Sequence, residues 1–149
     1  MNNIFRFLFL LFFNFYFTIG QSFADENRIK IGLLIPLTGD NAELGKQIVK
    51  ATRMALKDIN SGNLEIYPKD TQSDPTKTLR SAKELNQMGI KLVIGPVFHN
   101  NLIYLDEVSD TTFLSLTNKT LDLPKNVIST GVNSTSQINA IKKFIELNE

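Results

Sequence analysis

Polar side chains follow several predicted strands of this chain. They include His99, the only histidine of the sequence. Open α/β sheets bind ligands beyond the carboxyl ends of their strands, so the residues that follow each strand should share one rim. Hydroxyls, amides and backbone N–H groups beside helix N-termini suit a small polar or anionic ligand. The segments expected at this rim are residues 37–41, 70–74, 96–101 and 117–120.

These polar residues also have structural and catalytic alternatives. One alternative is a purely structural role as helix caps, because short polar side chains accept orphan backbone N–H groups. It applies to Asp40, Asp74, Asn100 and Asn101. Catalysis by His99 would need a partner that orients it, and the chain has no cysteine and no second histidine for a nucleophile system or a transition-metal cluster. We therefore expect a protein that is not an enzyme, with no catalytic residue, no metal site and no cofactor.

Three aspartates form the remaining candidate for chemistry. Asp40, Asp70 and Asp74 can gather at one sheet edge, as acids do in a divalent-ion or phosphoacceptor site. A secreted compartment, indicated below, is a poor setting for that chemistry. The glycines of residues 38–45 do not form a dinucleotide or phosphate-loop motif, so nucleotide binding is unsupported.

The first 24 residues predict a secretory signal peptide. Arg6 precedes an apolar run over residues 7–19, and small residues, Ser22 and Ala24, occupy the expected −3 and −1 positions. The run is shorter than the roughly 20 residues of a spanning helix, although an uncleaved membrane anchor is the alternative. We expect cleavage after Ala24, a periplasmic location and no stable membrane insertion after cleavage.

Composition narrows the classes of partner. Removing residues 1–24 removes Arg6 and no acid, which leaves 15 basic and 15 acidic residues. A neutral chain of this kind is not expected to bind nucleic acid. The absence of cysteine excludes disulfides and a lipid-bearing cysteine. Residues 25–149 have the length of one domain, so stability should come from a single core.

The hydrophobic pattern predicts the element order βαβαβαββα, which implies right-handed crossovers and a doubly wound parallel α/β sheet. The first strand starts at Ile29 and ends at a loop over residues 36–39. Further strands are expected at residues 64–67, 92–94, 112–116 and 127–130. Helices are expected from residue 40 or 41 to 59, from Asp74 to a stop at Gly89, over residues 100–108, and from a capping box at residues 134–137.

Three of these helices carry an apolar face that should pack on the sheet. The first should bury Leu44, Ile48, Ala51, Ala55 and Ile59. The second should bury Leu79, Ala82, Leu85 and Met88. The last should turn inward Ile138, Ile141, Phe144, Ile145 and Leu147.

Three segments in order resemble the type I periplasmic binding proteins. They are Ile-Gly-Leu-Leu-Ile-Pro-Leu-Thr-Gly at residues 31–39, Asp-Thr-Gln-Ser-Asp-Pro at residues 70–75, and Leu-Val-Ile-Gly-Pro-Val at residues 92–97. The resemblance is collinear over residues 28–149. It implies that residues 25–149 form the N-terminal lobe, lobe 1, of a two-lobed protein, and that the chain is truncated before its second lobe.

The resemblance also implies a ligand site. In the branched-chain amino-acid receptors of this family, the position matching His99 is typically a serine that binds the ligand carboxylate, and a second contact loop matches residues 117–120. The implied ligand contacts are Thr38, His99, Asn100, Thr117 and Asn118. The implied function is the solute-binding component of an ABC transporter, which delivers an amino acid or similar small polar ligand to a permease.

A second group of proteins shares part of the same pattern. Gly-Pro-Val-Phe-His-Asn-Asn at residues 95–101 and Phe-Leu-Ser-Leu-Thr-Asn at residues 113–118 also resemble the binding-protein-like domain of penicillin-binding-protein activators. That resemblance implies a regulatory domain whose partner is a peptidoglycan synthase. A secreted α/β enzyme is the third alternative, and it lacks a complete catalytic constellation.

Overall fold

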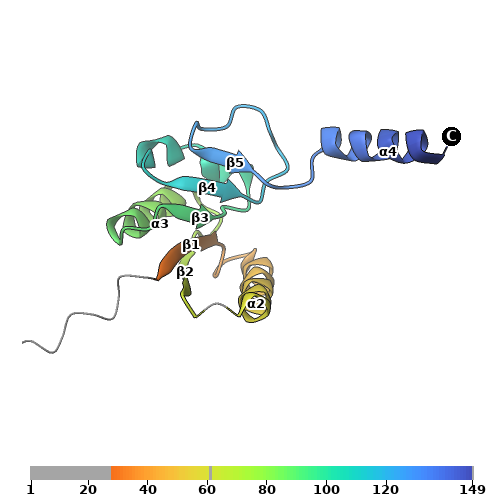
Figure 1. The fold of residues 1–149 in the computed structure, drawn as a ribbon. Coiled ribbons are helices and arrows are strands. Elements are labelled where there is room, and N and C mark those ends of the chain that lie inside the picture. The colour runs from red at the N-terminus through yellow and green to blue at the C-terminus, as the bar shows by residue number, and fades with distance from the viewer. Residues whose placement is uncertain (1–27, 61, 149) are drawn as a thin grey trace, which may run out of the picture.

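A computed structural model describes residues 28–60 and 62–148, so the predicted signal peptide and its cleavage site lie outside the described residues. Its centre is a five-stranded sheet of order β2-β1-β3-β4-β5, in which every neighbouring pair is parallel (Figure 1). The strands are β1 (Ile29–Ile35), β2 (Leu64–Asp70), β3 (Leu92–Ile94), β4 (Thr112–Ser115) and β5 (Val127–Ser129). The doubly wound parallel α/β sheet is confirmed.

The helical elements are α2 (Ala42–Ile59), α3 (Pro75–Gln87), α4 (Ser134–Asn148) and two 3₁₀ turns, η1 (His99–Leu102) and η2 (Leu105–Val108). The single helix predicted over residues 100–108 is therefore wrong. The side-chain amide of Asn126 donates to the carbonyl oxygens of Leu105 and Val108, so the chain is held in two short turns instead of one continuous helix. Within the described ranges, no helix has both the length and the apolar character to cross a membrane.

β2 extends three residues beyond its predicted end at Tyr67. Its parallel register runs from Leu64 opposite Ile29 to Asp70 opposite Ile35, and it includes Pro68. Proline lacks the N–H that a central strand needs, but β2 lies at the edge of the sheet and pairs only with β1. The extension places Asp70 directly beside the end of β1.

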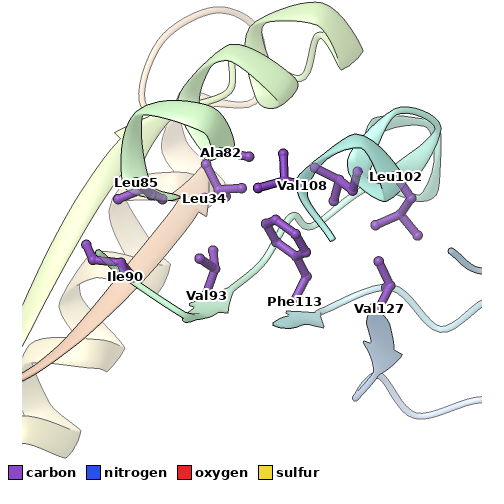
Figure 2. Close-up of a cluster of buried hydrophobic side chains, with 10 residues drawn as sticks. Leu34, Ala82, Leu85, Ile90, Val93, Leu102, Val108, Phe113 and Val127 are labelled. Carbon is purple, nitrogen blue, oxygen red and sulfur yellow. The ribbon is translucent and has the colours of Figure 1, made fainter. Parts of the chain in front are cut away.

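One face of the sheet carries the main core, which packs under α3 and the two 3₁₀ turns (Figure 2). Phe113 is its largest fully buried side chain, and Val93 and Leu85 are also fully buried. Met88, predicted to be buried, is 43% exposed, because α3 ends at Gln87 and Met88 is its C-cap. The predicted helix start and stop are confirmed, since Asp74 accepts the N–H of Lys77 and Gly89 has a φ of 79°.

α2 lies on the other side of β1 and β2, and its predicted packing face is wrong (Figure 1). Gly45 is the only buried residue of this helix, whereas Leu44 is 38% and Ile59 is 61% exposed. A Cβ at Gly45 would lie 1.8 Å from the Pro36 oxygen, so the helix backbone runs directly against the loop after β1. This close approach fixes the rotation of α2 and leaves the predicted apolar face largely open.

α4 extends away from the sheet after β5, and none of its residues is buried (Figure 1). The prediction that its apolar side chains turn inward is therefore wrong for this structure, and Phe144 is 69% exposed. The cap is also one residue earlier than predicted, because Asn133 Oδ1, and not the Ser134 hydroxyl, accepts an N–H of the first turn, that of Ser136 at 2.9 Å.

Candidate functional site

The loops after β1 and β2 are joined by the carboxylate of Asp70. Asp70 Oδ1 accepts the N–H of Leu37 at 2.8 Å, that of Thr38 at 3.3 Å and that of Gln72 at 2.9 Å. Its other oxygen, Oδ2, accepts the Thr38 hydroxyl at 2.5 Å. One half-buried side chain therefore fixes the backbone of both loops and the rotamer of Thr38.

The protonation state of Asp70 determines what Thr38 can offer a ligand. Burial by itself raises the pKa of Asp70, but the hydrogen bonds from the Thr38 hydroxyl and from three backbone N–H groups lower it more, so the net pKa is below its ordinary value. Asp70 is ionised at neutral pH and accepts hydrogen bonds only, so the Thr38 hydroxyl donates to it. Thr38 Oγ1 then keeps its lone pairs, which can accept a further N–H.

The loop between β2 and α3 has an unusual backbone. Gln72 and Ser73 have φ values of 50° and 58°, a left-handed conformation that costs non-glycine residues energy. Two hydrogen bonds beyond the one to Asp70 hold this turn: the Thr71 hydroxyl accepts the Ser73 N–H, and the Asn41 amide donates to Ser73 Oγ at 3.0 Å. Asn41 is thus used between loops and does not cap α2.

The loops after β3, β4 and β5 form a second bonded unit. Ser115 Oγ donates to the Pro96 oxygen at 3.0 Å, and the carbonyl oxygen of Thr117 accepts the Ser129 hydroxyl at 2.7 Å. Thr117 is only 6% exposed, and its hydroxyl oxygen accepts the N–H of Lys119 at 3.3 Å. Asn118 is exposed. Thr117 therefore holds the loop in shape, while Asn118 presents its amide to solvent.

The turn η1 carries the remaining candidate contacts. His99 and Asn100 line a hollow of about 620 Å³, and Asp106 and Asp122 also contribute to its wall. His99 Nδ1 and both amide atoms of Asn101 are buried without a hydrogen-bond partner among the described residues. Asn101 does not line the hollow, so of these atoms only His99 Nδ1 belongs to a residue of its wall.

The structure groups the predicted contacts into three sets. His99 and Asn100 share the hollow beside η1, Thr38 is bound to Asp70, and Thr117 and Asn118 lie in the loop after β4. All three sets follow the carboxyl ends of parallel strands at one edge of the sheet. Within residues 28–60 and 62–148, no group of three metal-ligating side chains comes together.

Sequence reasoning missed the roles of two residues in this region. From the sequence, Asp70 is expected in a rim segment and in a candidate metal or phosphoacceptor site, and Asn101 is expected in a rim segment or as a cap. The sequence predicts neither the hydrogen bonds of Asp70 to the loop after β1 nor the burial of Asn101. The signal for Asp70 was present: in parallel register it lies opposite Ile35, so an acid at that strand end faces the loop that begins at Pro36. No sequence signal marks Asn101, because its burial depends on the 3₁₀ turn that replaces the predicted helix.

Asp70→Asn is expected to lower the free energy of unfolding by about 1–2 kcal/mol at pH 7, since hydrogen bonds to a charged group are lost at a partly exposed site. The folded-state pKa of Asp70 is lowered, so its contribution is complete above the unfolded-state pKa of about 3.9 and is lost as pH falls through the folded value. Urea titrations at pH 7 and at about pH 3 should show the difference from wild type shrinking in acid. The control is Asp58→Asn on exposed α2; a pH-independent difference for Asp70→Asn would contradict this prediction.

Comparison with known proteins identifies the fold family. The model of a family described as periplasmic binding protein matches residues 28–144. Leu/Ile/Val-binding protein homolog 1 of Brucella abortus is 34% identical over 82 residues, which are 51% of this chain and 21% of that protein. The matched region thus spans about a fifth of the length of such curated relatives.

Solved structures of the same fold come from two functional groups. Leucine-binding protein LivK of Thermotoga maritima superposes with a TM-score of 0.62 at 18% identity, over 80% of this chain and 37% of that chain. Full-length LpoA of Haemophilus influenzae superposes with a TM-score of 0.58 at 26% identity, over 74% of this chain and 20% of that chain. Its C-domain is described as a regulator of PBP1A.

The family match covers most of the chain, the sheet has the order and parallel register of an open α/β ligand-binding lobe, and the solved neighbours are type I periplasmic binding proteins. This chain therefore belongs to the periplasmic binding protein family and has its type I fold.

Proposed function

We propose that this chain is lobe 1 of an extracytoplasmic solute-binding component of an ABC transporter, and that its rim binds an amino acid or a similar small polar solute. The role is binding and not catalysis. The rim would form one wall of the ligand cleft, a second lobe would form the other, and hinge closure would trap the ligand. The observation that carries the proposal is the carboxylate of Asp70, which fixes Thr38 at the strand ends.

The chemistry of the rim supports a ligand with both charges. Thr38 Oγ1 presents lone pairs beside the ionised Asp70, an arrangement that favours an ammonium group. Asn100 and Asn118 are exposed and carry amide donors, and the half-buried His99 carries an imidazole ring, on the segments after β3 and β4. Amide and imidazole N–H groups donate to a carboxylate. We propose Thr38, His99, Asn100, Thr117 and Asn118 as the contacts, with Thr117 acting through the loop that it shapes.

The first test is the thermal stability of the full chain with each of the twenty standard amino acids. A ligand that binds only the folded state raises the apparent stability with the logarithm of its concentration, by about 2.7 kcal/mol at 100 times Kd. We expect at least one amino acid to raise Tm in this concentration-dependent way. Constant Tm over the whole panel would contradict amino-acid binding.

His99→Ala is expected to weaken binding of that amino acid about fivefold while changing Tm without ligand by only a degree or two, since one hydrogen bond at a half-buried side chain contributes about 1 kcal/mol. Isothermal titration calorimetry measures the affinity, and a thermal melt measures the stability. Lys50→Ala, exposed on α2, is the control. Unchanged affinity in His99→Ala would remove His99 from the proposed contacts.

A regulatory domain that activates a penicillin-binding protein is the second candidate. It is favoured by the 26% identity to LpoA over 74% of this chain, higher than the 18% identity to LivK. A regulator would bind an immobilised peptidoglycan synthase and would not respond to the amino-acid panel. Retention of the chain by the synthase, with no ligand-induced rise in Tm, would favour this function over solute binding.

A further inference from the structure

All the cations of α2 lie on one side of this helix. They follow one another at steps of four, three and four residues, so their side chains form a single row along the helix. At 1.5 Å of rise per residue, the row is about 16 Å long. Each of these side chains is exposed, and we call them the cation row: Lys46, Lys50, Arg53 and Lys57.

No acidic side chain neutralises the cation row within the part of the chain that the structure describes. The acids of α2 are Glu43 and Asp58, and neither pairs with a member of the row. Lys69 on β2, in contrast, pairs with Glu84 at 2.7 Å. Burying several like charges without anions is costly, so the row belongs on a surface that meets water or an anionic partner.

Apolar side chains lie beside the cation row. The row lines a hollow of about 620 Å³ together with apolar residues of α2, of β2 and of the loop after β1. Met54 is one of these residues and is 60% exposed. The others are Leu37, Val49 and Pro68. Because Pro68 belongs to the edge strand β2, the hollow brings cations and apolar surface together at one edge of the sheet (Figure 1).

An anionic lipid bilayer has the matching chemistry. Its phosphate groups attract cations, and the hydrocarbon beneath them receives apolar side chains. Clusters of four or more lysines and arginines on one helix are typical of segments that bind anionic phospholipids. A hydrophilic polyanion would also attract the charges, but it would leave Met54 without an apolar contact. The combination in this hollow therefore favours lipid.

We infer that the cation row and its hollow bind the surface of an anionic phospholipid bilayer, with α2 lying along that surface. The contact is peripheral, since it uses exposed side chains of a helix that packs on its own sheet through Gly45. None of the five proposed ligand contacts lines this hollow. The inference thus concerns where the chain resides and does not depend on the proposed ligand.

Electrostatic attraction sets the expected strength of this contact. Each lysine or arginine near an anionic membrane raises the partition coefficient about fivefold, so the whole row contributes on the order of several hundredfold. The attraction is screened over a Debye length, which is about 10 Å at 0.1 M salt and about 3 Å at 1 M salt. Binding should therefore be reversible and should weaken steeply as salt is added.

The first experiment measures by flotation how the full chain partitions between buffer and lipid vesicles. One kind of vesicle is pure phosphatidylcholine, and the other contains about one third phosphatidylglycerol. The ratio of the two partition coefficients removes apolar contributions that are common to both. We expect a ratio of roughly 100 in dilute buffer and a fall of at least about tenfold at about 0.5 M NaCl. Equal partition into the two kinds of vesicle would overturn the inference.

Arg53→Gln with Lys57→Gln tests the row itself. Loss of half of its cations should lower the ratio about 25-fold. Lys91→Gln with Lys125→Gln is the matched control, because it removes exposed cations outside α2 and changes the total charge equally. The ratio of this control should stay within about twofold of wild type. Equal losses in the two double variants would indicate attraction to net charge alone and would contradict a site on α2.

The last experiment separates lipid from a soluble polyanion. Met54→Gln should lower partition into the anionic vesicles about fivefold, because an exposed apolar side chain loses its contact with hydrocarbon. The same variant should bind inorganic polyphosphate as wild type does. Met88→Gln, 43% exposed at the end of α3, is the control and should partition as wild type. A chain that binds polyphosphate but not the anionic vesicles, or an unchanged partition in Met54→Gln, would exclude lipid as the partner of this hollow.

Discussion

Gly45→Ala is expected to destabilise the protein by about 3 kcal/mol, at the upper end of the range for overpacking. The new Cβ would lie 1.8 Å from the Pro36 oxygen and 2.7 Å from the Pro36 carbonyl carbon, which are backbone atoms that no rotamer change can move away. α2 or the loop after β1 would have to shift. Urea denaturation at pH 7 measures the change in unfolding free energy.

Helix propensity alone predicts that Gly45→Ala stabilises the protein, so the measured change in unfolding free energy separates the two explanations by its sign. Glycine inside a helix is about 1 kcal/mol less favourable than alanine, so Gly45→Ala would stabilise α2 if the site were open. Gly62→Ala is the control, because a Cβ at Gly62 would meet no atom within 4 Å. A Gly45→Ala protein as stable as wild type would mean that α2 does not approach Pro36 so closely.

Phe113→Ala is expected to cost about 3–5 kcal/mol, because it removes a fully buried aromatic ring and leaves a cavity. Phe113 lies on the central part of β4 and contacts the cluster that joins α3 to the 3₁₀ turns (Figure 2). Native stability is only about 5–15 kcal/mol in ordinary domains, so much of the variant could be unfolded at 37 °C. Thermal and urea denaturation both measure the loss.

Phe113→Leu is the control for the core prediction. It keeps most of the apolar volume and should cost less than about 1.5 kcal/mol. The ratio of the two losses therefore reports the size of the cavity and not merely the presence of a mutation in β4. Equal losses for the two variants would indicate that the cluster collapses around either side chain, which would contradict the tight packing described above.

The elements that the sequence predicts well are those with strong local signals. Asp74 before Pro75 and the later Gly89 define α3 through backbone capping, and the structure has both features. The continuous aliphatic run at residues 92–94 marks a strand covered in a parallel sheet. These signals depend on neighbours a few residues away, so they survive without knowledge of the tertiary structure.

The wrong predictions concern which side of a helix is covered. The apolar pattern of α2 is real, but the contact between Gly45 and Pro36 sets its rotation, and a glycine carries no hydrophobic signal. The pattern of α4 is also real, yet nothing in this structure covers it. Periodicity shows that a helix has an apolar side, whereas the surface that meets that side depends on tertiary or quaternary contacts.

The position of the candidate site at the sheet edge could be predicted from the sequence. The hydrogen bonds that hold its loops could be predicted only in part. The rule for open α/β sheets placed the loops at one edge, and the structure has that edge. The contribution of Asp70 depends on the register of β1 with β2, which a predicted end of β2 at Tyr67 concealed. The ligand contacts themselves remain predictions that the binding experiments test.

Pro68 has a consequence for how the sheet can grow. An open parallel sheet has two outer strands, and each exposes hydrogen-bonding groups that can recruit a strand from another molecule. β2 carries a proline there, which removes one donor from the ladder, and β5 has only three residues. Both borders are thus poor templates for strand addition. Ordered self-assembly through β-augmentation, the route to fibrils, is accordingly disfavoured at both edges of this sheet.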